Sequence, residues 1–264
     1  GIPLAIELAA ARVRVMPVEE IADRLSDRFR LLTGGSRTAM PRQQTLEALI
    51  DWSYDLLTEQ EKVLLRRLSI FAGGWTLLMA EIVCADEQIQ KMEIMDVLTR
   101  LVDKSLVNAD TRRDEARFNM LETIRQYARN KLIQSGESVQ LRDRHLQTLS
   151  QFSEKVAPLL WQTDQVQWMD RLEEEHDNIR AALEWSLCEG CGKAHVMSGV
   201  NLADNIFLFW LVRGYWSECL DWLQKLQAHP ELKDAQDMDV IRLKYSIGFI
   251  TKELGDLHFA RDCF

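Results

Sequence analysis

Apolar residues in the first part of the chain recur every three or four positions in short blocks, which is the spacing of helices with one buried face. Pro3 suits a first helical turn, and Gly73-Gly74 suits a helix end. Thr58 and Glu61 have the spacing of a capping box, which marks a helix start. The pattern predicts helices over the approximate ranges 2–13, 18–25, 45–57, 59–71, 77–84 and 92–103.

Beyond residue 103 the apolar period changes from that of a helix to that of a strand. Residues 106–109 and 117–120 flank a polar connection, 110–116, which is typical of a β-hairpin with a charged tip. A helix with apolar residues close to a 3.6 period follows over 121–132. Short helices followed by a hairpin are the element order of a winged helix, so we expect that domain here.

Three short helices, 59–71, 77–84 and 92–103, precede the hairpin. The third of them, 92–103, takes the position that reads DNA in many winged helices. A reading helix presents several Arg, Lys, Asn or Gln side chains to the bases, whereas this one is of mixed charge. We therefore expect no direct nucleic-acid binding, and favour a module that faces protein or covers a nucleotide. The alternative is a DNA-binding winged helix with a basic stripe of Arg100, Lys104, Arg112, Arg113 and Arg117.

The second half of the chain repeats one kind of pattern, helix after helix. We expect helices over 141–160 and 166–188, with the charged run 173–177 as a solvated helical face. Within that run, His176 has no second histidine at helical spacing, so we do not predict it as a metal ligand. Residues Trp210, Leu211, Leu220, Leu223, Ile247 and Leu254 are predicted to be buried between the helices, and Phe259 and Phe264 to leave apolar surface at the end.

An internal repeat supports a solenoid of helical pairs. Residues 214–223 and 255–264 both begin with Gly, have a small residue five places later and an apolar residue nine places later. With Gly248 added, the spacing resembles the second-helix pattern of a tetratricopeptide repeat. The two copies start 41 residues apart, at Gly214 and Gly255, so extra residues are expected between the pairs.

These patterns predict a mainly α protein in three parts. Residues 1–50 are a partial helical domain, 51–135 a winged helix with a small β-hairpin, and 136–264 a helical linker and an α-solenoid arm of tetratricopeptide-like pairs. One core is expected in the winged helix. Its predicted members are Trp52, Leu68, Phe71, Leu98, Leu101 and Phe118.

Charge and composition narrow the functional classes. The chain has 264 residues and a net charge of −9; residues 1–135 hold 19 basic and 20 acidic side chains, and residues 136–264 hold 13 and 21. The acidic second half disfavours binding to a phosphate backbone. No apolar run approaches the roughly 18 residues that span a bilayer, so we expect no membrane association. Because the chain begins and ends within helical patterns, we expect it to be an internal part of a longer protein.

Five cysteines, an odd number, fit a reducing compartment, and we expect a cytoplasmic protein. Cys188 and Cys191 form a CxxC pair, whose nearest further ligand is His195. One interpretation is a zinc or redox site. We favour the other, a glycine-containing helix end without a metal, because zinc requires further ligands and redox CxxC pairs follow a strand.

Taken together, these features resemble the C-terminal part of the nucleotide-binding module of STAND-class (NB-ARC-like) signal-transduction ATPases, of the bacterial kind followed by tetratricopeptide repeats. Gly1-Ile2-Pro3-Leu4 resembles the GxP motif of that class, whose proline packs on adenine. Met120-Leu121-Glu122 stands where relatives carry Met-His-Asp. The resemblance implies nucleotide contacts by Gly1, Pro3, Leu4, Met120 and Glu122. Leu121 replaces the histidine that contacts phosphate in the class, and it cannot donate a hydrogen bond.

The sequence contains no GxxxxGK[ST] loop to hold phosphates, so we expect this chain to be neither an enzyme nor a tight nucleotide binder. ATP or ADP is implied for the intact protein only. The leading interpretation is a regulatory fragment whose winged helix is an intramolecular lid and whose arm binds a protein partner or small inducer, with oligomerisation open to the intact protein. The alternatives are a protein-interaction scaffold and a DNA-binding winged-helix regulator.

Overall fold

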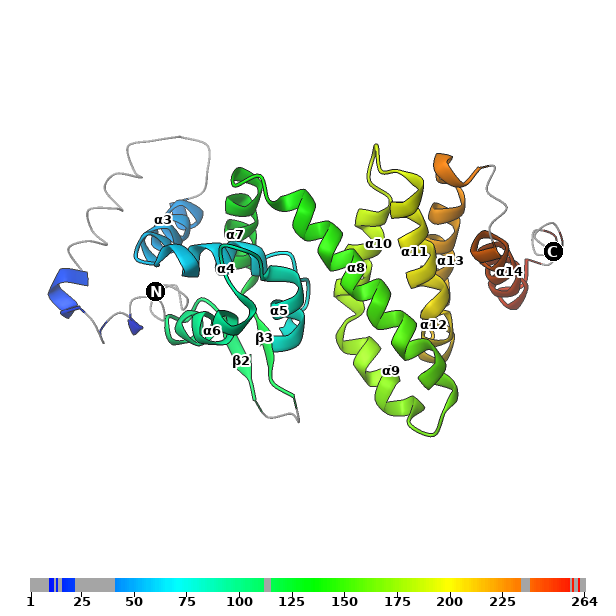
Figure 1. Cartoon of the computed structure of the whole chain (residues 1–264), viewed down its shortest axis with the longest axis horizontal. Helices are drawn as coiled ribbons and strands as arrows, with labels where there is room; N and C mark the ends of the chain where they lie inside the picture. The colour runs from blue at the N-terminus through cyan, green and yellow to red at the C-terminus, as the bar shows by residue number, and fades with distance from the viewer. Residues whose placement is uncertain are drawn as a thin grey trace. The chain divides into compact units, whose positions relative to one another are not determined.

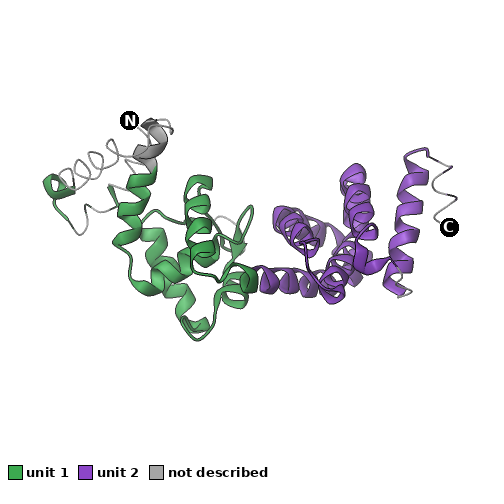
Figure 2. Ribbon diagram, turned by 90° about the horizontal axis from the view of Figure 1, so that it is seen from above, with its two compact units in different colours: residues 1–141 green, residues 142–264 purple. Residues whose placement is uncertain are grey.

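The computed structural model describes residues 10–11, 13, 16–21, 41–111, 115–233, 238–256, 258 and 261. Most of the two helices predicted before residue 26 lies outside these residues. The chain divides into two compact units, residues 1–141 and 142–264, which Figure 2 colours separately. The described part is mainly helical with one small sheet, so the predicted mainly α fold is confirmed (Figure 1).

The first unit contains the short helices and the sheet. Its elements are α3 (Pro41–Asp55), α4 (Glu59–Leu68), β1 (Trp75–Thr76), α5 (Leu77–Cys84), the 3-10 turn η1 (Lys91–Glu93), α6 (Ile94–Asp103), β2 (Asn108–Asp110), β3 (Arg117–Asn119) and α7 (Glu122–Gln134). Helix α4 starts as predicted, with Thr58 and Glu61 in a reciprocal capping box. It ends at Leu68 rather than Phe71, because Ile70 and Phe71 donate to the carbonyls three residues back, in tighter turns.

The sheet has one strand more than the predicted hairpin. Its order is β1-β3-β2, all antiparallel, and Phe118 of β3 pairs with Trp75 on one side and Ala109 on the other. Strand β1 has two residues, too few to show an alternating pattern in the sequence. Gly74 precedes it with a φ of +115°, and a Cβ there would lie 2.8 Å from the Phe118 carbonyl oxygen, so glycine is required.

The core of the first unit joins the helices to the sheet. Of the six residues predicted for it, five are buried in one apolar cluster: Leu68, Phe71, Leu98, Leu101 and Phe118. Trp52 is also buried, but it lies outside that cluster. The rings of Phe71 and Trp75 stack with centroids 5.5 Å apart at the centre. A single core thus supports both the helices and the hairpin, as the winged-helix prediction required.

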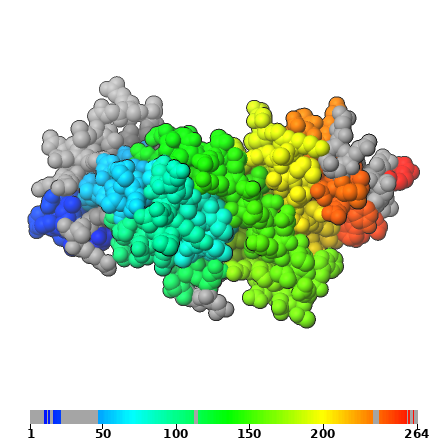
Figure 3. Space-filling view, in the orientation of Figure 1, coloured from blue at the N-terminus to red at the C-terminus, as the bar shows by residue number. Residues whose placement is uncertain are grey.

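Helix α8 (Ser138–Val156) leads into the second unit, where the described elements are all helical. They continue with η2 (Ala157–Trp161), α9 (Gln165–Glu174), α10 (His176–Ser186), α11 (Lys193–Asn205), α12 (Phe207–Arg213), α13 (Trp216–Gln227), η3 (Pro230–Leu232) and α14 (Met238–Glu253). The helix predicted over 166–188 is in fact two, α9 and α10, which meet at Glu175. Figure 3 shows the outer face of these helices in the same orientation as Figure 1.

The repeat glycines end helices in the same way. Gly214, after α12, has a φ of +82°, and Gly255, after α14, has a φ of +95°, so both occupy the left-handed conformation that ends a helix without strain. Helical pairs are therefore present, while their assignment to tetratricopeptide repeats stays a prediction.

Burial in this unit follows the prediction in part. Trp210, Leu223 and Ile247 are buried; Leu211 and Leu220 are only half-buried, and Leu254 is 48% exposed. Leu254 comes directly after the last residue of α14, where the chain turns, so the helical spacing that predicted its burial no longer applies. Phe259 and Phe264 lie outside the described residues.

Helix α11 approaches α10 closely at one point. A Cβ at Gly199 would lie 2.2 Å from Ser186 Oγ and 2.7 Å from its Cβ, so no side chain fits between the two helices. Among the described residues, no single helix is long and apolar enough to cross a membrane; the pair α11 and α12, bent by 44°, meets that length and composition only jointly.

Candidate functional site

The residues predicted to contact nucleotide do not form a described site. Gly1, Pro3 and Leu4 lie outside the described residues. Met120 is half-buried and packs against the winged-helix core. Glu122 opens α7, beside Leu121 at the N-cap position. Of the five predicted residues, the structure describes only Met120 and Glu122. Their contact with a nucleotide stays a prediction.

The carboxylate of Glu122 is engaged within its own helix. Arg125 donates to it twice, at 2.7 and 2.9 Å, and Gln126 donates at 2.8 Å. The Arg125 hydrogen bonds hold the pKa of Glu122 below its ordinary value. Leu121, 39% exposed, offers no polar group at the start of this helix. Glu122 is thus paired with a basic residue of its own helix.

The helix in the DNA-reading position, α6, has its basic end drawn inward. Glu61 of α4 is fully buried, and Lys104 Nζ lies 2.5 Å from its Oε1 while Arg100 Nε lies 3.5 Å away. Burial favours a raised pKa for Glu61, but the hydrogen bonds from Lys104 and the Thr58 amide outweigh it and lower the pKa. The two basic groups of α6 therefore neutralise a buried carboxylate. Met95 and Asp96 are exposed on the same helix.

A second buried ion network centres on Arg67. Its side chain is 2% exposed and lies 2.6 Å from Asp86 Oδ2 and 2.9 Å from Glu137 Oε1, while Nη1 donates to the Cys84 carbonyl at 2.8 Å. Arg66 binds the same Glu137 carboxylate at 2.8 and 3.1 Å. Glu137 stands in the turn between α7 and α8, so α4 holds the turn from which the arm begins.

Sequence reasoning missed this network, although one signal was present. Arg67 falls on the apolar face of α4, at helical spacing from Val63 and Leu64, where a solvated arginine would not be placed. A lone arginine on a buried stripe requires an anionic partner. Nothing in the local pattern identifies that partner as Glu137, which is 70 residues further along the chain.

The charged run 173–177 is a solvated face only in part, which corrects the sequence prediction: Asp177 is exposed, whereas two of the five residues are buried. Glu175 and His176 are each 4% exposed, because α9 ends there and the chain turns inward before α10 begins. Trp210 Nε1 donates to His176 Nε2 at 3.3 Å, and Glu218 Oε1 lies 3.2 Å from the same nitrogen. Burial, the largest influence, lowers the pKa of His176. These contacts place His176 in the packed interior of the unit. They do not test the prediction that it is not a metal ligand.

The CxxC pair ends a helix, as favoured, but it also forms a cluster. Helix α10 ends at Ser186, and Gly190 has a φ of +78° in the following turn. Cys188 and Cys191 are joined as a disulfide. With His195 they are the one group of three metal-ligand side chains within mutual reach in the described part of the chain.

Comparison with known proteins agrees with the fold of the first unit. Residues 57–133 match the winged helix-turn-helix domain family. Over 228 residues, 86% of this chain, the sequence is 45% identical to proteins named “Putative HTH-type transcriptional regulator” in Mycobacterium bovis and Mycobacterium tuberculosis. It is also 41% identical over 157 residues, 59% of this chain, to 40% of an uncharacterised protein of Mycobacterium tuberculosis. The chain therefore contains a winged helix-turn-helix domain and is homologous to these regulators.

The chain spans about a quarter of the length of the first of these relatives, 25%. Their name describes proteins much longer than the matched region. It does not assign DNA contact to the part that corresponds to this chain.

Proposed function

We propose that this chain is a regulatory region of a transcription-regulating protein, in which the winged helix makes protein contacts within the molecule and the helical arm receives the signal. The name of the relatives supports the regulatory role. The observation that carries the protein-facing role is the pairing of Lys104, directly after α6, with the buried Glu61, since it engages this basic group within the domain rather than at the surface that would meet DNA.

The joint at Glu137 supports a connection between lid and arm. A carboxylate that binds two arginines of α4 fixes the turn between α7 and α8, so movement of the first turn of α8 requires breaking charge-assisted hydrogen bonds. A partner or inducer that binds the arm would act by favouring one of two arrangements of this turn. The proposed ligand class is a protein or a small inducer, as the sequence predicts.

A finer proposal concerns the intact protein. The resemblance to STAND-class ATPases supports a switch driven by ATP and ADP, with the loop that holds phosphates located outside this chain. Within the chain, Pro3 and Leu4 would contact the adenine. Met120 and Glu122 would contact the nucleotide from the start of α7, where Met120 packs on the core and the exposed Glu122 carboxylate is held by Arg125.

The second candidate is direct DNA reading by α6 and the hairpin. It is favoured by the match of residues 57–133 to the winged helix-turn-helix family and by the exposure of Arg100, which is 45%. Two arginines of the proposed basic stripe, Arg112 and Arg113, lie outside the described residues.

A selection experiment separates the two candidates. The chain is incubated with a random duplex DNA library at physiological salt, and bound DNA is sequenced after several rounds. We expect no enriched motif, and no difference between the native chain and Arg100→Ala. An enriched sequence whose binding is weakened by Arg100→Ala, but not by the control Arg242→Ala in α14, would establish the DNA-reading function and refute the protein-facing one.

A further inference from the structure

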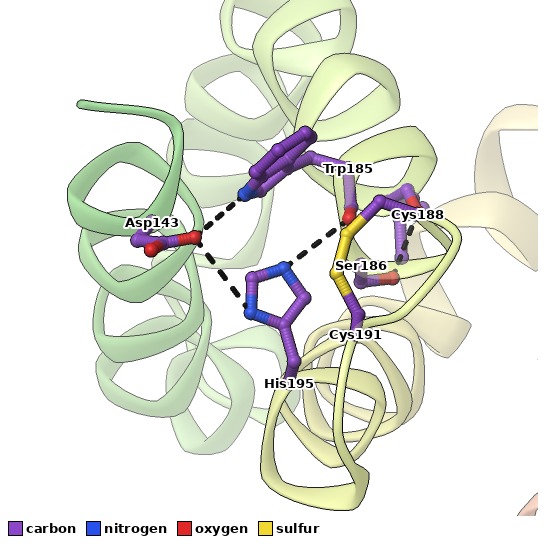
Figure 4. The surroundings of a disulfide bond; sticks show 7 residues. Asp143, Trp185, Ser186, Cys188, Cys191 and His195 are labelled. Carbon is purple, nitrogen blue, oxygen red and sulfur yellow. Dashed lines mark hydrogen bonds and ion pairs between the residues drawn. A yellow bond between two sulfur atoms is a disulfide. The ribbon is translucent and has the colours of Figure 1, made fainter. Parts of the chain in front are cut away.

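A cluster of sulfur and nitrogen ligands lies at the turn between α10 and α11 (Figure 4). One ligand atom each from Cys188, Cys191 and His195 lie within 4.8 Å of one another, and the two sulfurs are joined as a disulfide. All three side chains are half-buried, so an ion from solvent can reach them. Two thiolates and an imidazole are the ligand set that zinc prefers, whereas magnesium and calcium prefer oxygen.

The backbone holds the two cysteines together independently of the sulfur–sulfur bond. The Cys188 amide donates to the Trp185 carbonyl at 3.2 Å, and the Cys191 amide donates to the Cys188 carbonyl at 3.2 Å. Gly190 supplies the left-handed residue that this turn requires, with a φ of +78°. The turn is therefore in place for a metal when the cysteines are reduced.

A neighbouring carboxylate orients the histidine. His195 Nδ1 lies 3.7 Å from Asp143 Oδ1 of α8, and Trp185 Nε1 donates to that same oxygen at 2.8 Å (Figure 4). His195 Nε2 lies 3.2 Å from the Trp185 carbonyl oxygen. A metal on Nε2 would replace the contact of that nitrogen with the Trp185 carbonyl oxygen, while Asp143 stays beside Nδ1. A carboxylate on one ring nitrogen and a metal on the other is the usual arrangement of a metal-binding histidine.

We propose that, when the disulfide is reduced, Cys188, Cys191 and His195 bind one zinc ion, with Asp143 as the positioning residue for His195. The fourth position is left to water. The same turn thus has two alternative cross-links, a disulfide under oxidising conditions and a metal under reducing ones. Either one ties the end of α10 to the start of α11.

The exchange between the two states balances with a thiol or phosphine reductant. The sulfur–sulfur bond accepts two electrons and two protons and becomes two thiols. A thiol reductant supplies both protons and is oxidised to its disulfide; with a phosphine, water supplies the protons and the oxygen of the phosphine oxide. Zinc then displaces both thiol protons into solvent as the two thiolate bonds form.

The test uses cobalt as a coloured substitute for zinc. The whole chain is reduced with a phosphine, freed of metal without oxygen, and titrated with Co²⁺. We expect thiolate-to-cobalt charge-transfer absorption in the near ultraviolet and tetrahedral bands in the visible, saturating at one cobalt per chain and removed by Zn²⁺. Alkylation followed by mass spectrometry confirms that Cys188 and Cys191 are reduced at the start.

Variants assign the ligands. Cys188→Ala with Cys191→Ala should abolish the charge-transfer band, while Cys84 and Cys219, both buried, remain as internal controls for other thiols. His195→Asn should weaken binding and change the visible bands, whereas the control His229→Asn should leave both unchanged. Asp143→Asn should preserve the spectrum and weaken zinc binding about 10- to 100-fold, as measured by competition with a chelating dye. Circular dichroism verifies that each variant is folded.

Three results would overturn the proposal. The first is a reduced, folded chain that gives no charge-transfer band. The second is the same band in the double cysteine variant, which would place cobalt on other thiols. The third is a disulfide that withstands the phosphine in the folded chain, which would leave a permanent covalent cross-link as the role of this pair.

Discussion

The guanidinium of Arg67 and the carboxylate of Glu137 form a buried ion pair, 2.9 Å between Nη2 and Oε1, across 70 residues of sequence. One partner lies in α4 of the winged helix, and the other lies in the turn before α8. The pair belongs to both the domain core and the joint that follows it. A substitution of either residue should therefore affect the stability of both the domain core and the joint.

Glu137→Gln should destabilise the first unit by about 3 kcal/mol, because it leaves Arg67 buried with Asp86 as its remaining carboxylate partner in this network. Urea unfolding followed by circular dichroism measures the loss. Glu59→Gln, at a side chain 85% exposed, is the matched control and should change stability by less than about 0.5 kcal/mol. Equal effects from the two variants would show that the network contributes nothing at this joint.

The free energy of unfolding should decrease as the pH is lowered, in two separate pH ranges. Burial lowers the pKa of His145 to about 4 from an ordinary 6.5, so the folded state binds this proton less readily than the unfolded state, and stability is lost as pH falls from about 6.5 to 4. Despite its burial, Glu137 has its pKa lowered to about 2 by Arg66 and Arg67, so its contribution is present above about 4.5 and is lost below that value.

Denaturant unfolding at several pH values separates the two groups. Loss of the full His145 contribution amounts to about 3 kcal/mol between pH 7 and pH 4. A His145→Phe variant should show a flatter profile in that range and keep the loss below pH 4.5. A native chain equally stable at pH 7 and pH 4.5 would contradict the assignment of His145 as a buried neutral histidine.

Phe71→Ala should cost about 3–5 kcal/mol, since the ring is 1% exposed and stacks on Trp75 in the core. Thermal unfolding gives the change in melting temperature. Met92→Ala, at a side chain 86% exposed, is the control and should have almost no effect. If Phe71→Ala melts like the native chain, the winged-helix core does not depend on this residue.

The chain alone should bind ADP more weakly than a dissociation constant of about 1 μM, which corresponds to roughly −8 kcal/mol. The reason is that no phosphate-holding loop occurs in its sequence, and Glu122 is engaged with Arg125 and Gln126. Titration calorimetry measures the affinity. Tighter binding, weakened by Glu122→Ala but not by the control Glu115→Ala, would instead establish a nucleotide site at the start of α7.

The sequence predicted the local features of the fold well and the distant contacts poorly. Thr58 and Glu61 cap α4 as their spacing indicates, because a capping box involves only one helical turn. Strand β1 was missed because Trp75 and Thr76 are strands only through their pairing with β3. The register of that pairing depends on residues more than forty positions away, which no local pattern records.

Misreadings in the arm have the same origin. The run 173–177 predicts a solvated face because five charged or polar residues in succession usually face solvent. His176 is instead enclosed by Phe209 and Tyr215, with ring centroids 5.2 and 4.5 Å away, from helices that follow much later. For the CxxC pair, local spacing identifies only His195 as a nearby third ligand. Asp143 of α8, which lies 3.7 Å from His195, is too distant in sequence to be found in this way.

The absence of a side chain at Gly199 has a consequence for chemistry two turns away. Because a Cβ at Gly199 would lie 2.2 Å from Ser186 Oγ, the close approach of α10 and α11 at this point depends on the missing side chain. An alanine at this position would act as a wedge that moves the end of α10, and Cys188 with it, away from His195. The distances among the sulfur and nitrogen ligands would then depend on Gly199, which is not itself one of the ligands.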